Sequence, residues 1–338
     1  MNIKELCIQK SKEFKIDIIG FTSAAPFSYI EETLLNRQKK GYLSGFEEKD
    51  IKKRIDPCYT FPNAKTIIAV GEGYHVNWHE EVPDRPYGKL SKAAWGLDYH
   101  AVLKNKLNQL SDYLQKNLGG DYKAFVDTGP LIDREVAKRA GLGWQGKNCS
   151  VISPILGSWF FIGYLITDIE IEPDYPCYES YCETCDLCQK VCPTNALCKD
   201  YEMNAKKCIS YLTQTKEEIS PILRGKMGRQ LYGCDLCQSI CPYNQQIPFQ
   251  DKSYFYPLET SAYPDLEQIL TMSNKTFNEI YGSTASAWRG KPILQRNALI
   301  ALANNPNSHL VPLVQSFLQH PNVTLQKTAR WTLQKIED

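Results

Sequence analysis

Nine of the 13 cysteines in this chain fall between residues 182 and 241, and this stretch constrains the fold more than any other feature. All of them except Cys198 form two groups, and each group ends in Cys-Pro, at residues 192–193 and 241–242. The first group is spaced C-x2-C-x2-C-x3-C, and the second ends C-x2-C-x3-C with one cysteine further upstream. Thiolates at such short intervals are typical metal ligands. The stretch therefore predicts a metal centre.

The spacing is typical of bacterial ferredoxins, in which three cysteines of one run hold one 4Fe-4S cluster and the fourth holds a second cluster. Two such clusters need eight thiolates, and eight are present. The pattern assigns to cluster 1 the residues Cys182, Cys185, Cys188 and Cys241. It assigns to cluster 2 the residues Cys192, Cys208, Cys234 and Cys237. The crossed assignment predicts that the two segments pack against each other.

Structural zinc is the main alternative, because zinc sites also use C-x2-C pairs. Zinc ribbons usually present two cysteines per knuckle, so three at two-residue gaps favour iron and sulfur. Disulfides are least favoured, because the chain shows no secretory segment and C-x2-C geometry is cramped for bridging. We interpret the other five cysteines as buried free thiols. They are Cys7, Cys58, Cys149, Cys177 and Cys198.

Composition describes an ordinary globular protein. With 338 residues, 43% of them hydrophobic, the chain can bury a large core and form two or three domains. Its net charge of +1 gives no overall attraction to nucleic acid or to a membrane surface. No apolar run approaches the ~18 residues that span a bilayer, and the N-terminus lacks an export signal. We expect a cytoplasmic protein.

The N-terminal part predicts strands that alternate with helices, which favours an α/β domain. The expected helices cover residues 3–14, 29–40, 99–118 and 133–140, with Asp98 near the start of the third. The expected strands cover residues 16–21, 66–70 and 124–126, and an antiparallel hairpin covers 151–171. The hairpin suggests that the sheet mixes parallel and antiparallel strands.

The C-terminal part changes character. Residues 292–303, 308–319 and 322–336 predict three amphipathic helices, which resemble a short HEAT-like repeat. Residues 286–338 carry six basic and two acidic side chains, which suits a nucleic-acid backbone and equally a solvated helix face. The expected domains are an α/β domain at 1–176, a ferredoxin-like domain at 177–250, a connecting segment at 251–285 and a helical repeat at 286–338.

Several motifs together resemble the epoxyqueuosine reductase family over nearly the whole chain. They are Asp98-Tyr99-His100, residues 126–134, Gly141-Leu-Gly143 with Lys147-Asn148, residues 208–215 and 231–238, Trp288-Arg-Gly-Lys291, and residues 295–299. The resemblance implies reduction of epoxyqueuosine, at the wobble position of tRNA, to queuosine. This is the last step of queuosine biosynthesis, and the epoxide oxygen leaves as water.

The resemblance also implies the cofactors, namely cobalamin and two 4Fe-4S clusters. It places cobalamin in the N-terminal domain. The motif D-x-H-x-x-G, which supplies a histidine to cobalt in other cobalamin proteins, does not occur here. We therefore expect cobalamin to bind base-off. The expected partners are the anticodon stem-loop of tRNA and a low-potential electron donor, with no membrane partner and with the chain as a monomer.

Site residues follow from the same resemblance. Asp127 is the expected proton donor and a cobalamin contact, and a carboxyl group that donates at neutral pH needs a raised pKa. The other expected cobalamin contacts are Arg54, Tyr99, His100, Lys147, Asn148, Ser210 and Asp235. The expected tRNA phosphate contacts are Arg289, Lys291 and Arg296. From the residues alone, an aspartate before Thr-Gly-Pro, such as Asp127, more often serves as a turn residue or a helix cap than as an acid.

Three other classes of protein remain open at this point. A cobalamin and iron-sulfur reductive dehalogenase would share the cofactors, but such enzymes usually carry a twin-arginine export signal. A zinc-stabilised RNA-binding protein would have no catalytic role. An electron-transfer module would explain the clusters and leave the large α/β domain without a purpose.

Overall fold

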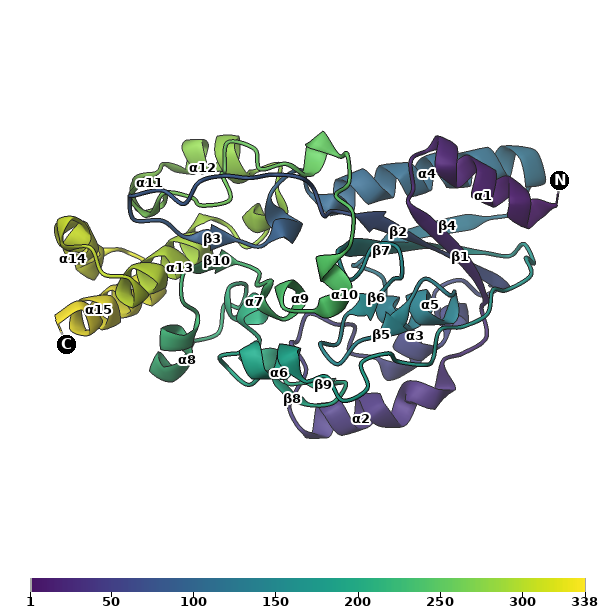
Figure 1. The fold of residues 1–338 in the computed structure, drawn as a ribbon, viewed down its shortest axis with the longest axis horizontal. Coiled ribbons are helices and arrows are strands. Elements are labelled where there is room, and N and C mark those ends of the chain that lie inside the picture. The colour runs from purple at the N-terminus through teal and green to yellow at the C-terminus, as the bar shows by residue number, and fades with distance from the viewer. Residues whose placement is uncertain (1, 338) are drawn as a thin grey trace.

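The computed structural model describes residues 2–337. Figure 1 shows the N-terminal sheet and its helices at one end, the C-terminal helices at the other, and the short helices of the cysteine region between them. The strands are β1 Ile18–Ser23, β2 Thr66–Gly73, β3 Lys89–Leu90, β4 Tyr122–Val126, β5 Trp144–Gln145, β6 Val151–Ile152, β7 Phe160–Thr167, β8 Leu197–Lys199, β9 Glu202–Met203 and β10 Gln230–Tyr232.

The α-helices are more numerous than the strands, and many are short. They are α1 Ile3–Glu13, α2 Glu31–Lys39, α3 Ile51–Ile55, α4 Tyr99–Leu118, α5 Asp133–Arg139, α6 Leu187–Val191, α7 Ile209–Leu212, α8 Pro221–Lys226, α9 Leu236–Ser239, α10 Pro242–Gln245, α11 Leu266–Thr271, α12 Asn274–Tyr281, α13 Lys291–Asn304, α14 Val311–Ser316 and α15 Val323–Glu337. None of the helices within residues 2–337 is long and apolar enough to cross a bilayer.

The main sheet has the strand order β1-β2-β7-β4, and every neighbouring pair is antiparallel. The predicted mixed sheet is therefore wrong. The predicted hairpin at 151–171 is also wrong, because β6 pairs with β5 while β7 crosses to the centre of the main sheet. The structure does confirm a combination of helices and sheet, with the other predicted strands and helices of this part near their expected positions.

Helix α4 covers one face of the sheet because its apolar side chains recur at helical spacing. Leu103, Leu107, Leu110 and Leu114 are fully buried against the sheet. The carboxylate of Asp98 accepts a hydrogen bond from the backbone N–H of His100 and so caps the helix. This cap fixes the first turn of α4 beside the end of β4.

Helix α13 joins the C-terminal helices to the cysteine region, and it is buried over nearly its whole length. Its polar side chains bond to backbone carbonyls of other segments. Asn297 Nδ2 donates to the carbonyls of Thr213 and Leu231, and Gln295 Nε2 donates to those of Ile269 and Leu270. Three helical segments do occur where the sequence predicts them near the C-terminus.

Candidate functional site

A cavity of about 970 Å³ lies where the first turn of α4, the end of β4 and strand β10 meet. Tyr99, His100 and Asp127 line it from the N-terminal domain, and Ser210 and Gly233 line it from the cysteine region. The last two residues each lie within two positions of a predicted cluster ligand, Cys208 or Cys234. The cavity therefore borders both an acidic group and the predicted metal region.

Asp127 follows β4 and adopts a left-handed backbone conformation, with φ of 55°. Aspartate is one of the few residues other than glycine that tolerates this region. Its Oδ2 accepts a hydrogen bond of 2.7 Å from Tyr99 Oη and lies 3.5 Å from His100 Nε2. The side chain is 63% exposed. The turn thus directs the carboxylate into the cavity, where two α4 side chains hold it.

The protonation of this group differs from expectation. The hydrogen bond with His100 is the main cause that lowers the pKa of Asp127, so its carboxylate is ionised at neutral pH. Burial opposes protonation of His100, but hydrogen bonds with Asp127 and Asp98 outweigh it and raise the pKa of His100 to about 9. In the protein alone, the pKa of Asp127 is therefore shifted in the direction opposite to the one that a proton donor needs. The resident proton lies on His100.

A second carboxyl group close by was missed from the sequence. Burial raises the pKa of Asp133, the first residue of α5, to about 8, and the charge of Asp127 adds to the effect. Its Oδ1 is buried and has no hydrogen-bond partner among the described residues. Its position after Leu-Ile, at the start of a helix, gave no signal beyond that of a helix cap. Asp133 is therefore neutral where Asp127 is charged.

The predicted cobalamin contacts fall in different places. Arg54 lines an adjoining cavity of about 350 Å³ together with Asp127. Asp235 lies behind the wall of the larger cavity, where it accepts hydrogen bonds from Ser91 Oγ, at 2.5 Å, and from the backbone N–H of Lys92, at 2.8 Å. Asp235 thus supports the wall.

Lys147 and Asn148 do not belong to the cavity around Asp127. Both line the cavity of the first cysteine group, where Lys147 Nζ donates to the carbonyl of Glu183 and pairs with Asp200 at 3.1 Å. The structure thus places them beside the first cysteine group and apart from the other predicted cobalamin contacts, directly after the short strand β5.

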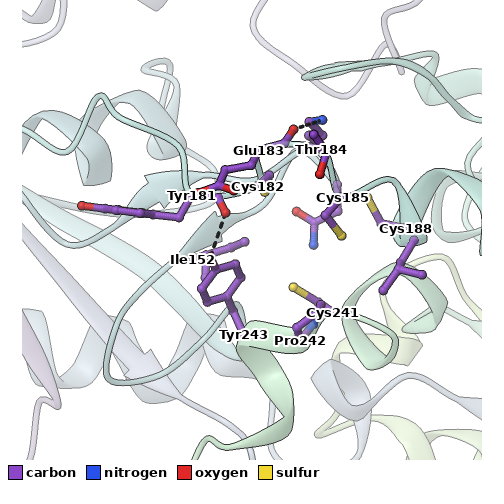
Figure 2. Close-up of a pocket in the computed structure, with 13 residues that line it drawn as sticks. Ile152, Tyr181, Cys182, Glu183, Thr184, Cys185, Cys188, Cys241, Pro242 and Tyr243 are labelled. Carbon is purple, nitrogen blue, oxygen red and sulfur yellow. Dashed lines mark hydrogen bonds between the residues drawn. The ribbon is translucent and has the colours of Figure 1, made fainter.

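Four predicted cluster ligands converge around one cavity of about 240 Å³, shown in Figure 2. They come from two segments, because Cys241 joins three cysteines of the first run. The four are Cys182, Cys185, Cys188 and Cys241. All 13 cysteines are free thiols. The convergence matches the crossed spacing of the sequence.

The other four cysteines are also near one another. Burial raises the pKa of Cys234 to about 12, and the charges of Cys208 and Cys192 act in the same direction. Burial likewise raises the pKa of Cys237, which lies within electrostatic range of Cys188 in the first group. The two groups are therefore adjacent.

The spacing of the cysteine side chains bears on zinc as an alternative. Within residues 2–337, no three Cys, His, Asp or Glu side chains are close enough to hold a single metal ion. A zinc ion needs thiolates about 2.3 Å from its centre, which draws the sulfurs close together. The arrangement of three thiols from one run and one from a second segment around one cavity matches the ferredoxin-type spacing.

The three predicted tRNA contacts also differ from one another. The Arg289 guanidinium lies 3.5 Å from the ring centre of Trp288 and 4.5 Å from that of Phe46, beside the large cavity. Lys291 Nζ donates to the carbonyl of Met272 and is half-buried. Arg296 is 2% exposed and donates to the carbonyls of Leu212 and Thr215. The prediction that Arg296 contacts phosphate is wrong, because its guanidinium is enclosed by the protein.

Comparison with known proteins agrees with this geometry. Residues 54–128 match the family described as epoxyqueuosine reductase QueG, DUF1730, and residues 181–244 match a 4Fe-4S double cluster binding domain. The chain is 41% identical to an epoxyqueuosine reductase of Bacillus cereus, over 99% of this chain and 89% of the relative. It is 40% identical to that of Bacillus subtilis, over 99% and 88%.

Solved structures give the same result. An epoxyqueuosine reductase bound to an epoxyqueuosine-modified tRNA-Tyr stem loop matches with a TM-score of 0.95 and 40% identity, covering 99% of this chain and 90% of that one. The enzyme from Streptococcus thermophilus matches with a TM-score of 0.93 and 40% identity, covering 99% and 90%. The chain belongs to the epoxyqueuosine reductase family and contains an iron-sulfur cluster domain.

Proposed function

We propose that this chain reduces epoxyqueuosine in tRNA to queuosine. The reaction consumes two electrons and two protons; both carbon-oxygen bonds of the epoxide break, a carbon-carbon double bond forms, and the oxygen leaves as water. The observation that carries the proposal is the shared cavity, which brings Asp127 and residues next to cluster cysteines together. A proton source and an electron source thus border one space large enough for a modified base.

The cavity also suits cobalamin. Tyr99 stacks on Phe161 with ring centres 4.0 Å apart and planes 5° apart, which gives a flat aromatic surface beside Asp127. Tyr99 and Ser210, with Arg54 in the adjoining cavity, would contact the cofactor, and Asp235 would keep the wall in place. When bound, cobalamin and the iron-sulfur clusters would supply low-potential electrons one at a time.

His100 bears on the base-off state. Among the described residues that line the large cavity, it is the one histidine. Its Nδ1 lies 2.7 Å from Asp98 and its Nε2 faces Asp127, so both ring nitrogens are engaged. This arrangement supports base-off binding, because the imidazole is not offered to a metal.

The chain's own residues would handle the oxygen. Asp127 reaches into the cavity and would hold a proton against the epoxide oxygen. Tyr99 Oη donates to Oδ2 of Asp127 and would keep the carboxyl group oriented.

We assign two 4Fe-4S clusters to the eight cysteines. The group with Cys208 and Cys234 would lie nearer the cavity, since Ser210 and Gly233 line that cavity. The group with Cys182 lies beside Tyr181, which is 54% exposed, and a low-potential donor would approach there. Electrons would then pass from the outer to the inner cluster.

An aromatic surface at the cavity mouth suits an unstacked base. Trp288 is 51% exposed, lies edge-on to Phe46 at 5.6 Å, and donates from Nε1 to Gln214 at 3.1 Å. Arg289 covers both rings. Single-stranded loops are recognised by stacking on aromatic and guanidinium planes. The stem loop bound by a relative supports tRNA as the partner. Arg289 and Lys291 would lie near its backbone.

The proposed division of labour follows the expected domains. Residues 1–176 would hold cobalamin, 177–250 the clusters, 251–285 the connection, and 286–338 the HEAT-like part that contacts tRNA. The parallel pairing of β3 with β10 supports close cooperation between the first two parts, since it crosses their boundary.

The test uses anaerobically purified protein reconstituted with iron, sulfide and cobalamin. It would be incubated with a low-potential reductant and tRNA carrying epoxyqueuosine, followed by mass spectrometry of the nucleosides. We expect loss of one oxygen from the modified base, dependent on cobalamin. No conversion at full cofactor loading would refute the proposal, and dehalogenation of a small halogenated phenol by the same preparation would favour the dehalogenase alternative.

A further inference from the structure

The first turn of α4 links two carboxylates through one imidazole. Asp98 Oδ1 lies 2.7 Å from His100 Nδ1, and His100 Nε2 lies 3.5 Å from Asp127 Oδ2. Asp98 also accepts from the backbone N–H of His100, so the cap of the helix fixes the imidazole's starting position. The ring can therefore point only one nitrogen at the cavity, and that nitrogen faces Asp127.

We propose that His100 is the proton store of the reaction and reloads Asp127, which delivers each proton to the substrate oxygen. This inference rests on the proposed function. The oxygen leaves as water and takes up two protons, whereas one carboxyl group holds one. A single donor would need refilling in the middle of the reaction, and His100 is placed to do so.

Each transfer balances. The N–H bond at His100 Nε2 breaks and an O–H bond forms at Asp127 Oδ2; that O–H bond then breaks as the substrate oxygen gains the proton. His100 regains a proton from solvent through its partly exposed ring, which is 36% exposed. Repeating the sequence supplies the second proton, and the two electrons come from the external low-potential reductant named above.

The surrounding charges favour a stored proton. Asp98 and Asp127 both attract a positive charge onto the imidazole, and their hydrogen bonds overcome burial to raise the pKa of His100 to about 9. The other titratable groups near the ring are Tyr99, stacked on it at 4.0 Å, with Tyr232, Lys104 and Glu47 on the cavity wall and Arg134 within range of Asp127. Glu47 favours the positive charge on the imidazole, whereas Lys104 and Arg134 oppose it.

A purely structural role for His100 makes a different prediction. A helix-start histidine that only packs or caps could be replaced by glutamine without a change in pH dependence. Glutamine has the reach to bond with Asp98 and with Asp127, but it cannot store a proton near neutral pH. His100→Gln therefore separates the two roles. Lys104→Gln, on the same helix and the same cavity wall, is the matched control.

The first measurement needs no cofactor and no turnover. NMR titration of the apo protein follows its five histidines, and His100 is assigned by its loss in His100→Gln. We expect it to titrate near pH 9 and to shift downward in Asp127→Asn. Titration near 6.5, the ordinary histidine value, would overturn the proposal whether or not the enzyme reduces epoxyqueuosine.

The second measurement is single-turnover reduction between pH 6 and 10 by the loaded enzyme. We expect the wild-type rate to fall as the pH rises through about 9, and His100→Gln to lose about 10²-fold in rate at pH 7 together with this pH dependence. Lys104→Gln should keep the wild-type rate and the wild-type pH dependence. An unchanged rate in His100→Gln, or an equal loss at every pH, would contradict proton storage. Failure of the wild type to turn over would instead count against the proposed function.

Discussion

The acid group around Asp127 lines the large cavity, and the cysteine region reaches that cavity through Ser210 and Gly233, yet the chain holds the two centres in different ways. In the acid group, side chains bond to one another, from Asp98 through His100 to Asp127 and Tyr99. The cysteines lie in short helices and turns, and all are free thiols. Hydrogen bonds between side chains organise the first centre, whereas the spacing of the second suits thiolates that bind an inorganic cluster.

The largest effect should come from removing one thiol. Cys237→Ser should abolish turnover and remove about half of the iron, because a 4Fe-4S cluster uses four cysteine ligands. Iron and sulfide analysis of the reconstituted protein measures this loss. Cys198→Ser is the control, since that cysteine is exposed and outside both groups. Full iron content in Cys237→Ser would remove this residue from the ligand set.

The reverse experiment changes only the acid group. Asp127→Asn should lower single-turnover reduction by about 10²- to 10⁴-fold, because an amide cannot carry a proton to the oxygen. Iron content should stay at the wild-type level, since no predicted cluster ligand lines the cavity with Asp127. Cobalamin absorbance is measured so that rates are compared at equal cofactor occupancy. If the variant retained turnover at full cofactor occupancy, Asp127 would not be the donor.

A third change tests what supports the cysteine side. Arg296→Met should destabilise the folded protein by about 3 kcal/mol, because the carbonyls of Leu212 and Thr215 lose their buried charged donor. We expect faster loss of iron than in the wild type during anaerobic dialysis against a chelator. We also expect unfolding at a lower urea concentration. Arg330→Met, on the exposed side of α15, is the control. Equal stability of the two variants would show that α13 does not support the cluster region.

The smallest effect should be a loss of affinity for tRNA that leaves the acid group and the clusters unchanged. Trp288→Ala should weaken binding of the tRNA stem loop by about 1–3 kcal/mol, the usual contribution of one stacked base. Fluorescence anisotropy measures the affinity, and iron content with the NMR titration of His100 shows that the two centres persist. Trp331→Ala is the comparison, because Trp331 does not line the large cavity. Unchanged affinity in Trp288→Ala would place the base elsewhere.

Periodic and local patterns predicted much of this fold. Helix α4 was predictable because its leucines recur along one face and Asp98 stands before it. The pairing of β6 was not, because a two-residue strand carries no alternation and its partner β5 lies across a tight turn. Strand direction was missed for a similar reason, since pairing between distant segments leaves no local signal.

The cysteine groups were predictable because ligand spacing is itself the chemical requirement. The protonation of Asp127 was not, because it depends on His100, which is 27 positions earlier and meets it only in the folded chain. Arg289 and Arg296 show the same limit, because they are close in sequence but differ in burial. Arg289 stacks on Trp288 beside the large cavity, whereas Arg296 is enclosed by the protein.

The buried polar face of α13 has a consequence for biosynthesis. Its side chains Arg296 and Asn297 donate hydrogen bonds to the backbone carbonyls of four residues near Cys208 and Cys234. These residues are Leu212, Thr213, Thr215 and Leu231. Ribosomes release the chain from its N-terminus onward, so these cysteine-bearing segments emerge long before the helix that secures them. Until α13 has been synthesised and has left the ribosome, the cysteine-bearing segments lack these hydrogen-bond donors. Stable insertion of metal should therefore follow the synthesis of α13.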